Sequence, residues 1–234
     1  MKRFIEKEKF NPSFFSIFYH PFYFVRKEIF AFLESNSNFL SGNLLDFGGG
    51  SKPYQDLFKN SQNYFSIEVL SNKENLKSDI YYNGSELPFA DNTFDSILCT
   101  EVFEHVEKLD DVIDELYRVL KPGGRMIVTT PFMCMEHEMP YDFRRFSFNG
   151  LSKLMKKNNF KILASQKLLN NFHVFFQTLN FYICQVFLKK KTKYLKYIIY
   201  FFLAGPINFL SFFFNFFLPK ADEMYFGTGM VLEK

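Results

Sequence analysis

Residues 44–54 read LLDFGGGSKPY, in which three consecutive glycines follow a short apolar run. Glycine loses more conformational entropy on folding than any other residue, so three together are costly unless the backbone must turn sharply or approach something closely. The run before them has the length and apolar character of a strand buried on both faces. The stretch therefore predicts a strand that ends in a tight glycine turn.

Further strands are predicted by short apolar runs, each rich in β-branched or aromatic residues. They are NYFSIE (63–68), FDSILC (94–99), RMIVTTP (125–131) and FKILAS (160–165). Between the second and third of these runs, apolar residues recur at helical spacing from Leu109 to Leu120, and Gly123 or Gly124 is expected to cap this helix. Strands that alternate with helices predict an α/β protein with a doubly wound, Rossmann-like sheet.

The glycine turn lies where such a sheet binds ligands, because ligands sit beyond the carboxyl ends of the strands. It is not a phosphate-binding P-loop, since no Gly-Lys-Ser/Thr follows, and Pro53 replaces the third glycine of GxGxxG. Glu68 ends the next predicted strand, where a carboxylate can accept both hydroxyls of a ribose. The pair predicts a nucleoside-type ligand, and the alternative is a structural turn beside a solvated glutamate.

Three motifs resemble those of the class I S-adenosylmethionine-dependent methyltransferases, and most of all the type 11 methyltransferase domain. They are LLDFGGGSKPY (44–54), GSELPFADNTFDSILCTEVFEHV (84–106) and LYRVLKPGGRMIVTTPF (116–132). The resemblance covers about residues 40–168 and the last strand. The chain departs from the family at Gly49, where Cys is usual, and at Asn83, where relatives often carry Asp.

The resemblance implies a seven-stranded sheet with an antiparallel last strand in MYFGTGMVLEK (224–234), and S-adenosyl-L-methionine as cofactor. The first strand end and the glycines would face the methionine part and the sulfonium, Glu68 the ribose, and residues 83–84 the adenine. His105 is expected to brace the following helix. The implied cofactor-binding residues are Asp46, Phe47, Gly48, Gly49, Gly50, Glu68, Val69, Asn83, Gly84, Thr100 and Glu101.

A loop rich in polar groups, PFMCMEHEMPYDFRRFS (131–147), follows the predicted strand RMIVTTP and is expected to cover the cofactor. Methyl transfer is an in-line displacement that needs alignment and, for a hydroxyl acceptor, removal of a proton. His137 is the predicted general base, because histidine ordinarily titrates near neutral pH, and Asp142 orients or replaces it.

The same loop supplies the predicted acceptor-binding residues, Tyr141, Arg144 and Arg145, of which the arginines suit an anionic part of the acceptor. The alternative is a loop pinned by a Tyr-Asp-Arg hydrogen-bond cluster. No metal site is predicted, because neighbouring residues such as Glu136, His137 and Glu138 point apart on an extended segment and HExxH is absent.

Residues 172–220 are strongly apolar and raise a separate question. FHVFFQTLNFYICQVFL (172–188) precedes the basic run KKKTKYLK (189–196) and a second apolar run (197–219) that Gly205-Pro206 interrupts. Two membrane crossings would place the lysines outside, against the usual bias of basic residues. We expect a helical hairpin in the cytoplasmic face of the membrane, with the lysines against anionic headgroups. The alternative is a buried cap or a dimer interface, which would make the protein a homo-oligomer.

Composition fits a cytoplasmic protein. The net charge of +3, from 28 Lys+Arg and 25 Asp+Glu, does not suggest a nucleic-acid-binding surface. The three cysteines form no CxxC pair, which favours a reducing compartment. The predicted organisation is an N-terminal helical segment (1–39), a methyltransferase domain (40–171 and 222–234) and the apolar insertion (172–221).

These expectations combine into one predicted function, methylation of a hydroxyl on a cell-envelope saccharide or lipid-linked glycan precursor. One alternative is C- or O-methylation of a quinone or another lipid. The other is a membrane-bound scaffold that keeps the fold without catalysis. Intact residues at the glycine turn and at Glu68 favour a functional cofactor site.

Overall fold

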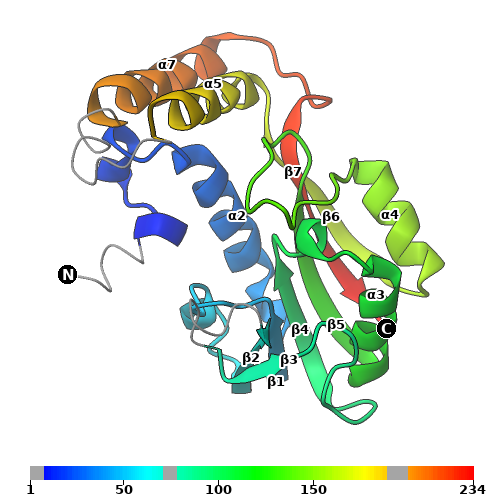
Figure 1. The fold of residues 1–234 in the computed structure, drawn as a ribbon. Helices are drawn as coiled ribbons and strands as arrows, with labels where there is room; N and C mark the ends of the chain where they lie inside the picture. Colours follow the sequence, from blue (N-terminus) through cyan, green and yellow to red (C-terminus); the bar gives the residue numbers. More distant parts are fainter. Residues whose placement is uncertain (1–7, 71–77, 189–199) are drawn as a thin grey trace. The chain divides into compact units, whose positions relative to one another are not determined.

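The computed structural model describes residues 8–70, 78–188 and 200–234 (Figure 1). Two compact units can be distinguished, and each is described by itself. The sheet unit comprises residues 32–132, 136–166 and 227–234, and the helical unit comprises residues 1–31, 133–135 and 167–226. The predicted domain boundaries at 39/40, 171/172 and 221/222 stay a prediction.

A seven-stranded sheet in the order β3-β2-β1-β4-β5-β7-β6 forms the centre of the fold (Figure 1). Its strands are β1 (Gly42–Phe47), β2 (Ser61–Val69), β3 (Ile80–Tyr82), β4 (Phe94–Thr100), β5 (Leu120–Pro131), β6 (Lys161–Asn170) and β7 (Tyr225–Glu233). The strands from β3 to β5 in this order pair in parallel, whereas β7 pairs antiparallel with β5. The predicted sheet and its antiparallel last strand are confirmed.

Helices cover both faces of this sheet. On one face, α3 (Leu109–Val119) and α4 (Phe148–Lys157) share a buried apolar core with Met230 of β7. On the other face, Gly229 of the same strand makes room for Phe32 of α2 (Tyr23–Asn36), because a Cβ atom at Gly229 would lie 2.5 Å from the ring. Adjacent strand residues point to opposite faces, so the sheet is doubly wound.

The predicted cap of α3 at Gly123 or Gly124 is wrong. The helix ends at Val119, and both glycines lie inside β5. The reason is the pairing of their backbone groups: the Gly123 N–H donates to the Lys234 carbonyl at 3.0 Å, and the Lys234 N–H donates to the Gly124 carbonyl at 3.0 Å. These bonds tie the segment to the end of β7, with Gly123 in a left-handed conformation at φ of 74°.

The glycine turn leads into a single 3-10 turn, η3 (Gln55–Leu57), because β2 begins only a few residues later, at Ser61. Strand β6 also continues beyond the predicted FKILAS and ends at Asn170. The other short helical turns of the sheet unit are η2 (Ser37–Phe39) and η5 (Phe103–His105).

The helical unit contains two apolar helices that pack side by side (Figure 1). They are α5 (Phe172–Leu188) and α7 (Gly205–Phe217), which follows the π-helical turn η6 (Tyr200–Ala204). Another 3-10 turn, η1 (Phe14–Phe18), contacts α7, and Gly205 permits this contact because a Cβ atom there would collide with the Phe18 carbonyl. The basic run 189–196 lies outside the described residues.

Several buried polar side chains lie inside this unit, beside an apolar cluster of Phe176, Ile183 and Ile207. Asn208 donates hydrogen bonds to the carbonyls of Ile17 and His20, at 2.8 and 3.0 Å. Asn180 donates to the Asn208 side chain at 2.9 Å, and Gln177 donates to the Pro21 carbonyl at 2.9 Å. The side chains of His173 and Ser211 lie 2.7 Å apart in a further hydrogen bond.

Apolar side chains, in contrast, cover the outside of α5 and α7. Many of the large ones are exposed to solvent: Phe175, Leu179, Tyr182, Val186, Phe209, Phe212, Phe213, Phe216 and Phe217. Asn180, Asn208 and Ser211 are buried at the same time. The two helices thus bury polar groups among apolar ones while they expose large apolar side chains.

Candidate functional site

The carboxyl ends of β1, β2 and β4 meet at one edge of the sheet. Phe47 pairs with Ile67 on one side and with Cys99 on the other. The Gly48 N–H continues the ladder to the Ile67 carbonyl at 3.0 Å. The register therefore brings the glycine turn, Glu68 and Thr100 together at this edge, as the parallel sheet predicts.

Each of the three glycines has a different structural role in the turn. Gly48 has φ of 71° and could not carry a Cβ atom, which would lie 2.5 Å from a methyl carbon of Val102. A Cβ atom at Gly49 would collide with the carboxylate of Asp46. Gly50 follows, and its carbonyl accepts a hydrogen bond from the Ser78 hydroxyl at 3.3 Å. The turn therefore exposes bare backbone beside a buried acid.

That acid, Asp46, is held by a residue that the sequence did not reveal. The Tyr64 hydroxyl donates to Asp46 Oδ2 at 2.6 Å. Burial raises the pKa of Asp46 to about 7, although the Tyr64 hydrogen bond opposes the shift. The strand register explains the contact: Asp46 pairs with Ser66, so Tyr64, two residues before Ser66, is the diagonal neighbour of Asp46.

The ion pair between Lys52 and Asp79 lies next to the same turn. Lys52 Nζ lies 2.5 Å from Asp79 Oδ1, and Asp79 Oδ2 accepts from the Ser66 N–H at 2.9 Å. The Lys52 hydrogen bond helps to hold the pKa of Asp79 below its usual value, against the opposing effect of burial. The end of the glycine turn is thus fastened to the segment that precedes β3.

The predicted ribose-binding residue, Glu68, is buried, and its Oε1 accepts from the Val69 N–H at 3.1 Å. Thr100 ends β4, and its Oγ1 is buried without a hydrogen-bond partner among the described residues. Glu101 follows with φ of 55°, a left-handed conformation that is uncommon for a residue other than glycine. A buried orphan hydroxyl and an unusual backbone at a strand end are typical of a ligand-binding edge.

Asn83 and Gly84, predicted to face the adenine, lie beyond β3 and are exposed. Asn83 Oδ1 accepts from the N–H of Ser85 at 3.1 Å and from its hydroxyl at 2.8 Å. Because Tyr82 pairs with Val69, this turn is adjacent to the end of β2. The structure thus places these residues next to the predicted ribose site.

The loop after β5 is pinned by Asp142, whose side chain is only 1% exposed. The Nη1 and Nη2 nitrogens of Arg145 both donate to the Asp142 carboxylate, Nη2 at 2.7 Å. The His137 N–H donates to Asp142 Oδ2 at 2.8 Å. The Arg145 hydrogen bonds lower the pKa of Asp142 to about 2, so this carboxylate is ionised and saturated with donors.

The other predicted acceptor residues make different contacts. Arg144 donates to the carbonyls of Val106 and Glu107, at 2.6 and 2.8 Å. These two bonds fix the orientation of the Arg144 guanidinium and leave its other N–H donors for further contacts. The Tyr141 side chain is exposed, while its carbonyl lies 2.6 Å from Nδ1 of His105. Arg144 and the Asp142–Arg145 pair therefore stabilise the loop.

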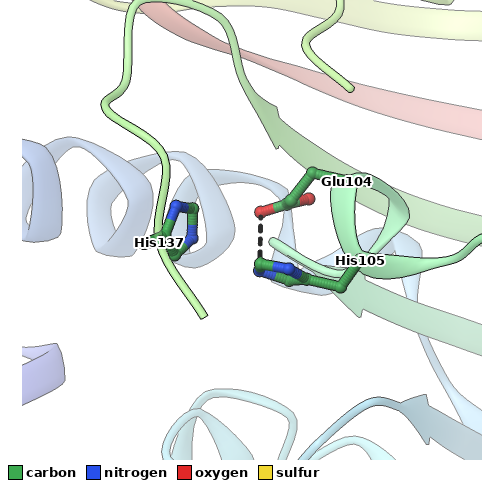
Figure 2. Close-up of side chains that lie close together, drawn as sticks. All are labelled: Glu104, His105 and His137. Carbon is green, nitrogen blue, oxygen red and sulfur yellow. Dashed lines mark ion pairs between the residues drawn. The ribbon is translucent and has the colours of Figure 1, made fainter. Parts of the chain in front are cut away.

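Glu104, His105 and His137 converge at the base of this loop (Figure 2). His105 Nε2 lies 3.7 Å from Glu104 Oε1, and the two imidazole rings meet edge to face with centroids 4.8 Å apart. His137 Nδ1 is 3.5 Å from Asp142 Oδ2. Burial and the nearby Glu101 raise the pKa of Glu104 well above its usual value.

The sequence analysis missed Glu104. The signal was available, because a carboxylate in the otherwise apolar VFEHV has few ways to remain solvated once η5 packs against the sheet. Figure 2 shows its carboxylate directed towards the two histidines rather than towards solvent. The predicted catalytic residue His137 therefore belongs to a three-residue cluster.

Comparisons with known proteins identify the cofactor-binding half of the sheet unit. Residues 45–128 match the methyltransferase domain family. A demethylmenaquinone methyltransferase of Symbiobacterium thermophilum is 42% identical over 67 residues, which cover 28% of this chain and 24% of that protein. An uncharacterized protein of Methanocaldococcus jannaschii is 32% identical over 137 residues, 56% of this chain and 59% of that one. The chain thus spans less than two thirds of either relative.

Solved structures agree on the fold. A SAM-dependent methyltransferase of Archaeoglobus fulgidus aligns over 100% of both chains with a TM-score of 0.55 and 15% sequence identity. The bare glycine backbone, the buried Asp46 and the Glu68 carboxylate at one strand edge fit S-adenosyl-L-methionine, which offers a cationic methionine part and a ribose diol. Residues 45–128 therefore match a methyltransferase domain, and the chain has the fold of class I S-adenosylmethionine-dependent methyltransferases.

Proposed function

We propose that this protein transfers a methyl group from S-adenosylmethionine to a hydroxyl of a lipid-linked saccharide or envelope glycan precursor at the cytoplasmic face of a membrane. The family supplies the cofactor and the reaction class. The acceptor class is argued from the loop cluster and from the helical unit.

Cofactor binding is assigned to the carboxyl edge of the sheet. Asp46 offers a carboxylate beside the glycine turn for the positively charged methionine part, and Glu68 accepts the ribose hydroxyls. When bound, the cofactor presents a methyl group on a sulfonium, which is activated for displacement. The chain then has to align the acceptor, exclude water and remove the acceptor's proton.

Proton removal is assigned to His137. Its imidazole lies 3.5 Å from the ionised Asp142, which favours a proton on Nδ1 and a lone pair on Nε2. Asp142 is saturated by Arg145 and by the His137 N–H, so it acts as a positioning residue rather than as the base. Tyr141, with its exposed side chain, is retained as the acceptor-binding residue of this loop.

The observation that carries a membrane-bound acceptor is the exposure of large apolar side chains on a helical unit that buries asparagines. Phe216 is 78% exposed while Asn208 is 1% exposed. Apolar surface in contact with water costs roughly 25 cal/mol per Å², so a soluble unit would bury these rings and leave the asparagines outside. Polar residues between helices and apolar residues around them are typical of membrane proteins.

We propose that the helical unit contacts only one leaflet of the membrane. Among the described residues, one helical stretch, Tyr200–Phe217, is long and apolar enough to cross a bilayer, and 22% of it is buried. The chain must return to the sheet through β7, and the basic run 189–196 separates the two apolar helices in the sequence. A hairpin lying in the cytoplasmic leaflet satisfies both conditions.

A second candidate acceptor is a quinone or another lipid. It is favoured by the similarity to a demethylmenaquinone methyltransferase, which is confined to 67 residues. Both candidates are amphiphilic and suit the apolar hairpin, so they differ in the methylated headgroup rather than in the membrane contact.

The test uses the full chain in liposomes with methyl-labelled S-adenosylmethionine and a lipid extract of the source organism. Label in a glycolipid whose sugar is released into water by mild acid supports the proposal. Label that stays in the apolar quinone fraction supports the second candidate. The His137→Gln variant, checked for S-adenosylhomocysteine binding, should bind but transfer no label; transfer at the wild-type rate would refute the role of His137.

A further inference from the structure

We propose that Glu104, His105 and His137 bind a divalent transition-metal ion of the Zn²⁺ class. One ligand atom from each residue can be chosen so that all three lie within 4.8 Å of one another (Figure 2). Two of the residues come from η5, and the third comes from the loop that Asp142 pins across it. All three belong to the sheet unit.

The tautomer of His105 is the first reason. Its Nδ1 lies 2.6 Å from the Tyr141 carbonyl, which can only accept, so Nδ1 carries the proton. In the neutral ring, Nε2 then presents a lone pair to two carboxylates, Glu104 at 3.7 Å and Glu138 at 4.0 Å. A cation between these groups would stabilise the arrangement. Histidines that bind metals commonly donate their other N–H to a backbone carbonyl in this way.

The second reason is the environment of His137. Its Nδ1 faces Asp142 Oδ2 at 3.5 Å, and Arg145 and the loop backbone hold that carboxylate in place. A carboxylate behind one imidazole nitrogen orients the ring and makes the other nitrogen a better ligand. The edge-to-face contact at 4.8 Å keeps the His137 ring beside the His105 ring.

The third reason is independent of the histidines. Glu104 is 0% exposed, and neither of its carboxylate oxygens accepts a hydrogen bond from any residue that the structure describes. Burying a carboxyl group without hydrogen bonds is costly, and buried charges in proteins are paired or coordinate metals. A bound cation would compensate this carboxylate, whose recorded ion-pair partner, His105 Nε2, lies 3.7 Å away and outside hydrogen-bond distance.

The donor set selects the kind of ion. Two imidazoles and one carboxylate form a known ligand set of catalytic zinc sites, which keep a fourth position open. Imidazole nitrogen favours Zn²⁺, Ni²⁺ or Co²⁺ over Mg²⁺ and Ca²⁺. Zn–N bonds of about 2.0–2.1 Å place tetrahedral ligand atoms about 3.3 Å apart. The present separations would have to contract modestly, which rotation of the partly exposed His137 ring permits.

With the ion bound, His137 Nε2 would be a ligand, so the ion would replace His137 as the group that assists removal of the acceptor's proton. An open position on the ion has a use in the proposed reaction, and this step alone rests on the proposed function. The acceptor oxygen would bind there and lose its proton to solvent more easily, as metal-bound water does. Its electron pair would then form the new O–CH₃ bond while the S–CH₃ bond breaks and the sulfonium becomes a neutral thioether. The ion changes neither charge nor oxidation state.

The experiment is a metal titration of the full chain in detergent, after chelator treatment and without cofactor or acceptor. Calorimetry with Zn²⁺ should give one ion per chain, and Co²⁺ should give the visible absorption of a four- or five-coordinate site. His105→Gln, His137→Gln and Glu104→Gln should each weaken Zn²⁺ binding at least tenfold. The chain has four histidines, so His20→Gln and His173→Gln are matched controls that should leave the affinity unchanged.

Each variant is checked for folding by its circular dichroism and its S-adenosylhomocysteine affinity. No Zn²⁺ binding by the folded wild type, or binding that His105→Gln and His137→Gln leave intact, would overturn the metal site. Cys134→Ser serves as a further control for adventitious thiol binding. A protein that binds Zn²⁺ as expected but methylates no acceptor would refute the proposed function and not this site.

Discussion

Tyr64 donates a 2.6 Å hydrogen bond to the buried carboxylate of Asp46, directly beneath the glycine turn. The two residues lie on adjacent parallel strands and are two positions apart in register, because Asp46 pairs with Ser66 and Tyr64 pairs with Leu44. They lie at the carboxyl edge to which cofactor binding is assigned in the proposed function. Two further carboxylates, Glu68 and Asp79, raise the pKa of Asp46, whereas Lys52 lowers it. The charge of Asp46 is therefore sensitive to pH near neutrality.

Cofactor binding should strengthen as the pH rises through 7. Asp46 has a pKa of about 7 in the folded chain, so at pH 6 about a tenth of it is ionised. A cationic methionine part binds the ionised form, so binding releases a proton and the affinity increases with pH until it levels off above 7. Titration calorimetry with S-adenosylhomocysteine should show roughly tenfold weaker binding at pH 6 than at pH 8.

Two variants test the origin of this dependence. Asp46→Asn should bind weakly at every pH and show no slope. Tyr64→Phe removes the hydrogen bond that lowers the pKa of Asp46, so the midpoint should move to higher pH. A slope that survives in Asp46→Asn would assign the titration to another group.

The Glu68 carboxylate should contribute a large part of the cofactor affinity. Hydrogen bonds to a charged group contribute about 1.5–3 kcal/mol each, so Glu68→Ala should weaken S-adenosylhomocysteine binding roughly 10- to 100-fold. The exposed Glu86 provides the control, and Glu86→Ala should bind like the wild type. Equal affinities for the two variants would remove Glu68 from the ribose site.

The sequence predicted this edge of the sheet well because parallel strands leave little freedom. Once residues 44–47 and 63–68 are read as neighbouring strands, Gly48 and Glu68 must end at the same edge. Tyr64 could not be predicted in the same way. Its contact depends on a diagonal register between strands, which the apolar pattern of either strand does not specify.

Two other features depended on long-range contacts. The glycines of KPGG pair with Lys234 at the other end of the chain, which turned a predicted helix cap into a strand. Glu104 is buried because η5 and the loop close over it, and the N–H of Phe143 in that loop donates to the Glu104 carbonyl at 2.9 Å. Local propensity carries no information on either contact.

The Asp142–Arg145 pair should stabilise the sheet unit at neutral pH. The pKa of Asp142 falls from 3.8 to about 2, so its stabilising contribution is fully present above pH 4 and is lost as the pH falls towards 2. Two pKa units correspond to roughly 2–3 kcal/mol, which solvent screening reduces to about 1–3 kcal/mol because the residue as a whole is only half-buried. Asp142→Asn should therefore lower the free energy of unfolding at pH 7 by about this amount.

Denaturant unfolding at several pH values provides the measurement. The difference between the wild type and Asp142→Asn should shrink as the pH falls from 4 to 2. Asp110, whose side chain is 63% exposed in its ion pair with Lys157, is the control, and Asp110→Asn should change the stability little. A constant difference at all pH values would mean that Asp142 acts through its shape rather than through its charge.

The exposed rings of α7 should hold the protein on membranes without contributing to its fold. The triple variant Phe209→Ser, Phe212→Ser and Phe216→Ser tests this contact. Its membrane partition coefficient, measured by liposome flotation, should be at least 100-fold lower than that of the wild type, because each ring buried in the membrane contributes roughly 1.5–3 kcal/mol. Its thermal stability in detergent should stay close to that of the wild type, because these side chains are exposed. Phe65→Ser, in the sheet unit, is the control and should float normally.

The opposite result is expected for the polar interior of the same helices. Asn208→Ala removes the donor for the carbonyls of Ile17 and His20 and the acceptor for Asn180, so it should destabilise the helical unit by about 1–3 kcal/mol. The folded fraction should still float, since the outer surface is unchanged. Two results would contradict the membrane contact. One is flotation of the triple phenylalanine variant at the wild-type level. The other is a loss of stability in that variant without a loss in Asn208→Ala, which would make the apolar face a buried protein interface.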